Sequence, residues 1–173
     1  LMPKYNKKIL IIENRINILK FDKIAKILID KKIEVNWLIQ NNLFLPKNGN
    51  LHIIKYPTKK DLKKKVPSAI KKIKYSDRGY IFFNNKTEHY NYYYMKIKKI
   101  IDNLKPDLIL GEATLFHELI TIAISKKKKI RYLFLGASRF INDRLSFYKF
   151  DTFDVSGGAN KKLPKYNFLK ILS

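Results

Sequence analysis

Two short apolar runs in the second half of the chain are each followed by polar side chains that could carry chemistry. The runs are Asp107–Leu110 and Ile130–Leu135, and the residues of interest after them are Gly111, Glu112, Thr114 and His117, then Gly136, Ser138, Arg139 and Arg144. Carboxylates and imidazoles transfer protons, and a guanidinium binds anions through a planar fork. Ligands of an open parallel sheet bind beyond the carboxyl ends of its strands. We therefore expect a site there.

Glu112 and His117 are the candidate catalytic residues. Glu112 directly follows a buried run, so we expect its carboxylate to point into the crevice, where it could accept hydrogen bonds or act as a base. The alternative is a solvated turn residue that bonds to nearby amides. His117 could face the same crevice, but it needs a positioned partner to act as acid or base. Its alternative is a packed structural histidine.

Gly111, Thr114, Ser138, Arg139 and Arg144 are the candidate substrate-binding residues. We expect the Thr114 hydroxyl chiefly to cap the following helix, whose exposed amides favour an anion. The two arginines stand out because arginine supplies only five of the 37 basic residues. Arg139 either clamps an anionic ligand or forms an internal ion pair with Asp143, Asp151 or Glu112, and the sequence leaves both interpretations open.

Apolar periodicity predicts an α/β fold, a Rossmann-like parallel sheet with helices on both faces. The predicted strands are Lys8–Glu13, Val35–Ile39, Leu51–Tyr56 and the two runs above; the predicted helices are Phe21–Lys32, Thr87–Leu104 and the segment between the two runs. Residues Thr58–Lys74 have helical spacing that Pro67 interrupts, which predicts two short helices. We place one domain at residues 1–150 and interpret 151–173 as a linker or tail.

Several kinds of site are not expected. The chain has no cysteine, and its three histidines are too far apart for a metal site. The segment after the first strand lacks the glycine pattern of a dinucleotide site, and no phosphate-loop motif occurs. We expect no metal and no cofactor in this chain. Tyr90, Tyr92, Tyr93 and Tyr94 have helical spacing, which favours a core face over a base-stacking surface.

The net charge of +23 is extreme for a chain of this size. Such a charge can indicate nucleic acid or an anionic membrane as a partner. However, the chain is rich in Lys, Ile, Asn, Phe and Tyr, which A/T-rich codons encode, and its lysines are spread along the sequence. We favour genome composition as the cause, so a basic nucleic-acid-binding module is the alternative function rather than the leading one. Peripheral contact with an anionic membrane is compatible with either cause.

The segment from Pro106 to Tyr148 resembles the N-terminal half of bacterial capsule and surface polysaccharide biosynthesis proteins, which are GT-B glycosyltransferase-like. The resemblance is carried by Pro106, Asp107, Gly111 and Glu112 around the first run and by Ser138, Arg139, Arg144, Phe147 and Tyr148 after the second. The resemblance in sequence covers about 45 residues. In the part of the chain before Pro106, only the order of the predicted strands and helices is similar.

This resemblance implies a cytoplasmic glycosyltransferase-like domain, with peripheral association at the inner membrane face as one option. The domain would be the acceptor-binding half of a two-domain enzyme, binding a saccharide or lipid-linked saccharide and incomplete alone because the second domain is absent. A nucleotide-sugar donor is expected for the full enzyme. Half of a sugar-nucleotide epimerase is a further alternative.

Overall fold

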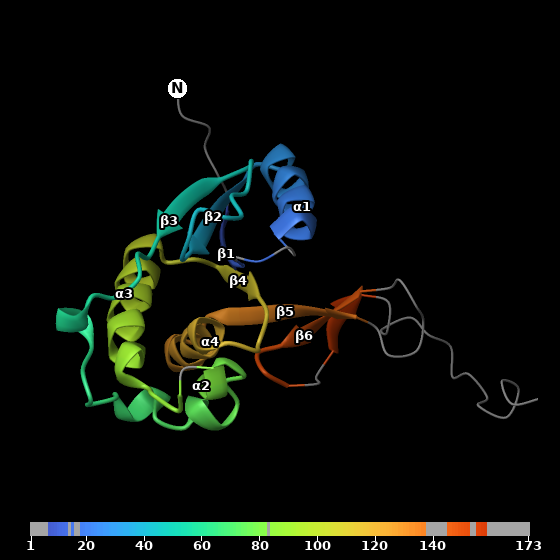
Figure 1. Cartoon of the computed structure of the whole chain (residues 1–173). Helices are drawn as coiled ribbons and strands as arrows, with labels where there is room; N and C mark the ends of the chain where they lie inside the picture. Colours follow the sequence, from blue (N-terminus) through green and yellow to red (C-terminus); the bar gives the residue numbers. More distant parts are fainter. Residues whose placement is uncertain are drawn as a thin grey trace, which may run out of the picture.

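The computed structural model describes residues 7–13, 15, 18–82, 84–137, 145–152 and 155–158 (Figure 1). The strands are β1 Lys7–Ile12, β2 Ile33–Ile39, β3 Asn50–Ile53, β4 Leu108–Gly111, β5 Arg131–Ala137, β6 Leu145–Lys149 and β7 Val155–Gly158. The α-helices are α1 Ile18–Asp30, α2 Gly79–Phe82, α3 Glu88–Leu104 and α4 Phe116–Lys128. Three short 3₁₀ helices, Lys59–Asp61, Ser68–Ile70 and Ile73–Tyr75, connect β3 to α2.

The strands form one sheet in the order β3-β2-β1-β4-β5-β6-β7. All pairs from β3 to β5 are parallel, whereas β6 and β7 are added antiparallel. The predicted Rossmann-like α/β class is therefore confirmed, including the parallel pairing of the two runs that β4 and β5 now define. The antiparallel strands β6 and β7 were not predicted.

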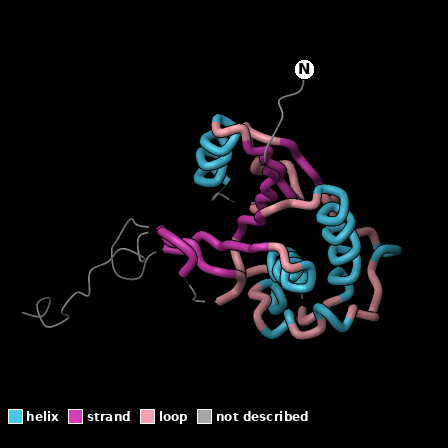
Figure 2. The backbone as a smooth tube through the Cα atoms, turned by 180° about the vertical axis from the view of Figure 1, so that it is seen from behind, coloured by secondary structure: helices cyan, strands magenta, loops and turns pink. Residues whose placement is uncertain are grey.

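Helices cover both faces of the parallel part of the sheet, and a separate core lies on each face (Figures 1 and 2). In β1, Leu10 and Ile12 pack into the core beneath α3 and α4, while Ile9 and Ile11 pack into the core beneath α1. Consecutive side chains of a strand point to opposite faces, so a parallel strand covered on both sides is a continuous apolar run. The KILII segment of β1 has this pattern.

Several local predictions need correction. Two short helices were predicted within Thr58–Lys74, and the structure has three 3₁₀ helices in this region, the second of which begins directly after Pro67. Strand β5 does not end at Gly136, which pairs with Ser146 of β6. Four residues of the predicted linker, Val155–Gly158, form β7 and pair with β6. β6 and β7 form through pairing with a neighbouring strand, and strand preference depends more on such context than on the local sequence.

The order of the strands reverses at β1. The chain proceeds from β1 outward to β2 and β3, then returns to place β4 on the other side of β1. This makes the carboxyl ends of β1 and β4 the topological switch point of the sheet, where α/β folds bind their ligands. Among the described residues, no helix combines the length and apolarity needed to span a bilayer.

Candidate functional site

A cluster of charged side chains lies at the switch point, and we call it the charge cluster: Glu13, Arg15, Glu112, Thr114 and Glu118. Glu13 and Arg15 follow β1, and Glu112 follows β4. Arg15 Nη2 donates to Glu112 Oε2 and to Glu118 Oε1, each at 2.7 Å. Its Nε lies 3.4 Å from Glu13 Oε1, and its Nη1 lies 3.3 Å from Thr114 Oγ1. One guanidinium therefore joins the ends of two strands and the start of α4.

Glu118 organises the start of α4. Its Oε2 accepts hydrogen bonds from the backbone amides of Thr114 at 2.8 Å and Leu115 at 3.0 Å, and from the Thr114 hydroxyl at 3.1 Å. The prediction that Thr114 caps this helix is wrong, because the N-cap position falls on Leu115. A carboxylate one turn into the helix satisfies amides that otherwise lack partners, and it also interacts favourably with the helix dipole.

Burial dominates the electrostatics of the cluster. Glu13 and Glu118 are fully buried, and burial raises the pKa of each carboxyl although Arg15 opposes the rise. Burial alone would lower the pKa of Arg15, but the three surrounding carboxylates together raise it. The guanidinium is therefore permanently charged, and its charge opposes the rise that burial causes in the pKa of Glu13 and of Glu118.

Carboxylate oxygens of Glu13, Glu112 and Glu118 lie within 4.8 Å of one another, and this is the one such group among the described residues. Three carboxylates could in principle bind a divalent cation. Here the Arg15 guanidinium is ion-paired with all three. The positive charge that the carboxylates need is already supplied by the chain, so the cluster is an arginine-centred ion-pair network.

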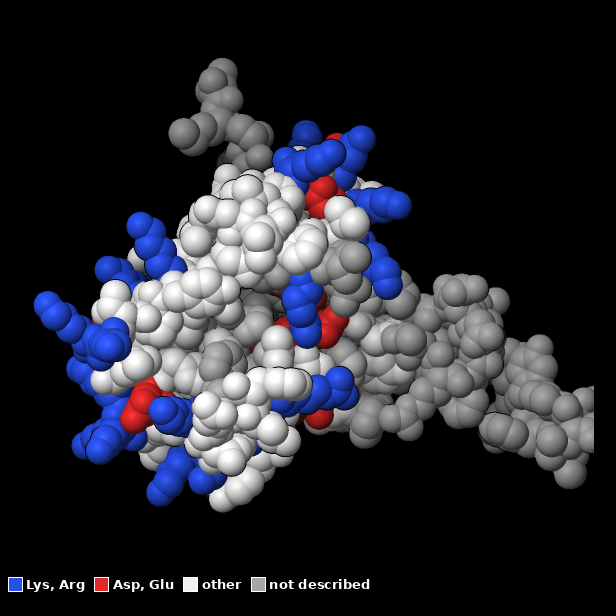
Figure 3. All heavy atoms as spheres, in the orientation of Figure 1, with Lys and Arg blue, Asp and Glu red and all other residues white. Residues whose placement is uncertain are grey.

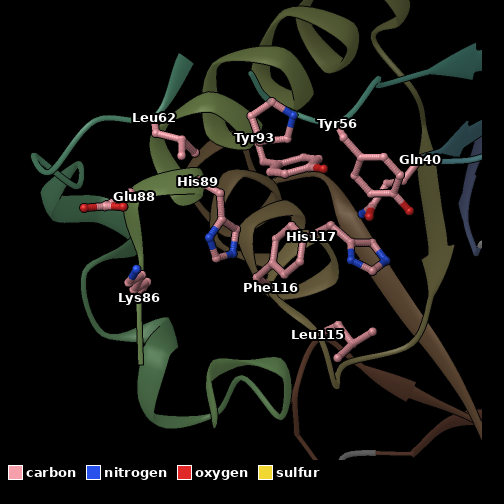
Figure 4. Close-up of a pocket in the computed structure, with 11 residues that line it drawn as sticks. Gln40, Tyr56, Leu62, Lys86, Glu88, His89, Tyr93, Leu115, Phe116 and His117 are labelled. Atoms are coloured by element: carbon pink, nitrogen blue, oxygen red, sulfur yellow. The ribbon is translucent and has the colours of Figure 1, made fainter. Parts of the chain in front are cut away.

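A pocket of about 400 Å³ opens beside the charge cluster, and we call it the aromatic pocket. Its principal lining residues are Gln40, Tyr56, His89, Tyr93, Phe116 and His117 (Figure 4). Gln40 follows β2, and Tyr56 lies beyond β3, so the pocket occupies the carboxyl edge of the sheet. The helices α3 and α4 form its opposite wall, where the ring of His89 packs edge-on against Phe116 at 4.6 Å between centroids.

His117 belongs to both the pocket and the cluster. Its Nε2 lies 3.6 Å from Glu118 Oε1, and the residue also lines the pocket. Burial, reinforced by the charge of Arg15, lowers the pKa of His117 to about 3, so the ring is neutral at physiological pH. Its Nδ1 is buried and has no hydrogen-bond partner among the described residues. Such an orphaned ring nitrogen costs free energy unless a ligand or water supplies a bond.

The predicted site residues are thus partly brought together. Glu112, Thr114 and His117 meet at the switch point, within or beside the charge cluster. Ser138, Arg139 and Arg144 lie outside the described residues. Their predicted approach to Glu112 therefore stays a prediction. The ion pair proposed between Arg139 and Glu112 has a counterpart in the described structure, since Arg15 is bound to Glu112.

Sequence reasoning missed Arg15, Glu13 and the structural role of Glu118. The residues after the first strand were used only to exclude a dinucleotide motif. Arg15 nevertheless carried a signal, because it is one of five arginines in a lysine-rich chain and it follows the first strand of an α/β pattern. Its partners Glu112 and Glu118 are 97 and 103 residues away, which no local pattern could reveal.

Gly111 lies at the end of β4, where the chain is too crowded for a side chain. A Cβ atom built there would lie 2.5 Å from the Tyr132 hydroxyl oxygen and 3.0 Å from the Ile12 carbonyl oxygen. The Tyr132 hydroxyl donates a hydrogen bond to the Glu112 carbonyl. The absence of a side chain at Gly111 therefore allows the Tyr132 hydroxyl to bond to the turn that contains Glu112. This packing role of Gly111 is additional to the contact with substrate that the sequence predicts for it.

We expect Gly111→Ala to lower the free energy of unfolding by about 2 kcal/mol, because the added methyl group overpacks a filled site. Urea denaturation of the two proteins measures the difference. The double variant Gly111→Ala/Tyr132→Phe should lose less than the sum of the two single variants, since removing the hydroxyl relieves the closest contact. Strict additivity would mean that the contact with Tyr132 does not cause the effect.

No protein-family model matches the chain, and a search of curated proteins likewise finds no match. Solved structures that resemble it include GT-B-type glycosyltransferase and epimerase folds. UDP-GlcNAc 2-epimerase from Methanocaldococcus jannaschii is 18% identical with a TM-score of 0.47, over 79% of this chain and 33% of that one. MurG from Acinetobacter baumannii is 12% identical with a TM-score of 0.48, over 74% and 34%.

The C-terminal domain of a hydrogenase from Pyrococcus furiosus also resembles the chain, at 13% identity and a TM-score of 0.49, over 78% of this chain and 94% of that domain. The chain spans about a third of the length of the epimerase and of MurG. With identities this low and TM-scores below 0.5, these similarities carry no assignment of activity or substrate.

Proposed function

We propose that this chain is the acceptor-binding half of a glycosyltransferase-like enzyme of surface polysaccharide synthesis. The aromatic pocket would bind a saccharide, free or lipid-linked, and a second domain would supply the nucleotide-sugar donor. The proposed location is the cytoplasm, at the inner face of the membrane when the acceptor is lipid-linked. The observation that carries the proposal is the position of the pocket, at the carboxyl edge of a parallel sheet and beside its switch point.

The chemistry of the pocket suits a sugar. Its lining is mostly apolar and includes the rings of Tyr56, Tyr93 and Phe116, against which the C–H faces of a pyranose can pack. A few polar side chains interrupt this surface, among them Gln40, Lys86 and Glu88. Pockets that select small molecules combine an apolar lining with a small number of placed polar groups in this way.

The charge cluster gives Glu112 and His117 their proposed roles. Glu13 and Glu118 are fully buried, whereas the Glu112 side chain is 20% exposed. Glu112 is thus the carboxylate of the cluster that a bound ligand can reach, and its second role is to pair with Arg15. His117 lines the pocket and contacts Glu118 of the cluster, so a bound sugar would lie close to the groups that hold Glu112.

Saccharide binding by the isolated chain tests the pocket. We expect simple methyl glycosides to perturb the NMR signals of Tyr56 and Phe116, and Tyr56→Ala to weaken the binding about tenfold by removing an exposed wall of the pocket. Tyr75→Ala is the matched control, because Tyr75 is also an exposed tyrosine but does not line the pocket. Equal weakening in both variants, or perturbation of residues remote from the pocket, would contradict the proposal.

Transfer by the two-domain parent enzyme tests the chemistry. We expect Glu112→Ala to lower the rate at least about 100-fold, because it removes the accessible carboxylate of the site, and Glu112→Gln to lower it similarly while better preserving the fold. Retained transfer in both variants would reduce Glu112 to a structural partner of Arg15. The reaction product also distinguishes a transferase from an epimerase. An epimerase would invert the configuration at one carbon of the sugar-nucleotide and would not join the sugar to an acceptor.

A further inference from the structure

A second pocket, of about 580 Å³, also lies at the start of α3 but shares no lining residue with the aromatic pocket. We call it the lysine pocket. Its polar lining residues are Lys64, Lys65, Lys71, Lys74, Ser68 and Thr87. It is built from the 3₁₀-helical connection between β3 and α2 and from the start of α3. None of the residues of the charge cluster lines it.

The walls of the lysine pocket are held in place by the core. The amide of Lys63 donates to the Glu88 carbonyl of α3 at 3.1 Å, which fixes the connection against that helix. Ile70, between two of the lysines, is fully buried. Tyr90 closes the bottom of the pocket, and its hydroxyl donates to Asp77 Oδ2 at 2.6 Å. The lysines are therefore attached to an ordered concave surface.

The charge of the pocket is not neutralised from within. Lysine ion pairs in the described part of the chain involve Lys8, Lys98, Lys126 and Lys128, and none involves a lysine of the pocket. The carboxylate of Asp77 is buried and is occupied by Tyr90 and by the amide of Gly79. The Ser68 and Thr87 hydroxyls also make no side-chain hydrogen bond to the described residues.

What sets these lysines apart is that four of them line one concavity. A general lysine excess spreads positive charge over convex surface, where the ammonium groups separate and are hydrated. Figure 3 shows Lys and Arg side chains, with acidic atoms among them, along the edge of the molecule where Figure 1 places the connection between β3 and α2, and also over α1. Four lysines line this one concavity, and a polyvalent anion bound there would interact favourably with their combined charge.

We propose that the lysine pocket binds an anion that carries two neighbouring phosphate groups. A phosphate monoester has a charge of about −1.5 to −2 at neutral pH, and two phosphates joined through a bridging oxygen carry less than twice that charge, which four lysines can balance. Lysine binds phosphate as a point charge, and the two hydroxyls can donate to the remaining oxygens. The source is either a soluble diphosphate or the diphosphate-bearing headgroup of a lipid. This inference is independent of the proposed saccharide site.

Binding of inorganic diphosphate, measured by calorimetry in about 50 mM salt, tests the proposal. The pocket variant replaces Lys64, Lys65, Lys71 and Lys74 by glutamine. The matched control replaces four exposed lysines of or next to α1, namely Lys20, Lys23, Lys26 and Lys31. Both variants lose the same net charge, and all the altered side chains lie away from the buried core, so thermal melting should show that both fold.

We expect the pocket variant to bind diphosphate at least about tenfold more weakly and the control to stay within about twofold of the original chain. A lipid source is identified if vesicles that carry a diphosphate headgroup bind with the same dependence on the pocket lysines while free diphosphate does not. Equal losses in the two variants, or no binding of either probe, would overturn the proposal. Preferential binding of single-stranded RNA that depends equally on both lysine sets would also overturn it.

Discussion

Replacing Arg15 by methionine is expected to destabilise the chain by about 3 kcal/mol at about pH 8. Methionine keeps much of the side-chain volume but leaves Glu13, Glu112 and Glu118 as neighbouring carboxylates without a cation. Breaking a buried ion pair from one side costs about 3–5 kcal/mol. The low end applies here because the Arg15 side chain is 38% exposed and partly screened by water.

The loss should depend on pH in a defined direction. Burial raises the pKa of Glu13 and of Glu118 above the ordinary value of 4.5, so each carboxyl binds its proton more tightly in the folded chain than in the unfolded chain. Stability from such a group is fully present below its unfolded pKa and is lost as the pH rises through its folded pKa. Without Arg15, the pKa values of Glu13 and Glu118 in the folded chain rise further, because the charge of Arg15 lowers them. The pH range over which the folded chain loses stability therefore extends to higher pH.

Urea denaturation of the original chain and of Arg15→Met between about pH 5 and pH 8 measures this effect. The difference between the two proteins should shrink toward the acidic end, where protonated carboxyls need no cation. Arg15→Lys is the control, because it keeps the charge but its single ammonium group lacks the planar fork that contacts several carboxylates. We expect it to be intermediate. A loss that is independent of pH would contradict the ion-pair explanation.

Glu118→Ala is expected to cost about 3 kcal/mol and to loosen the start of α4. The variant leaves the amides of Thr114 and Leu115 without their acceptor, and each unsatisfied buried donor costs about 1–3 kcal/mol. Arg15 keeps two of its three carboxylate partners, so the larger part of the loss comes from the backbone. The effect should reach the aromatic pocket, since His117 lies in the first turn of the same helix.

Amide hydrogen exchange localises this effect. In Glu118→Ala, exchange at Thr114, Leu115 and His117 should accelerate more than exchange in the middle of α3. Glu118→Gln is the matched variant, because its amide oxygen can still accept from both backbone amides, and we expect it to lose only about 1 kcal/mol. If glutamine costs as much as alanine, the carboxylate acts through its charge on Arg15 and the capping explanation is wrong.

The sequence by itself determined the layered α/β architecture and the place where a site should form. Continuous apolar runs such as β1 identify strands that are buried on both faces, and the spacing of Tyr90, Tyr93, Ile97 and Ile101 identifies the buried face of α3. Both signals are local, because burial imposes the period of the element on consecutive side chains. Glu112 and His117 could be named as candidates for the same reason, since each follows a recognisable strand.

Only the tertiary structure decided how those candidates are held. Glu112 is bound by Arg15, which comes from the other end of the chain, and Glu118 is a buried cap rather than a solvated residue of the first helical turn. The Nδ1 of His117 is orphaned because α4 packs against α3 and the sheet. Such features arise when segments about 100 residues apart are brought together, and burial then sets charge states that the residue types alone leave undefined.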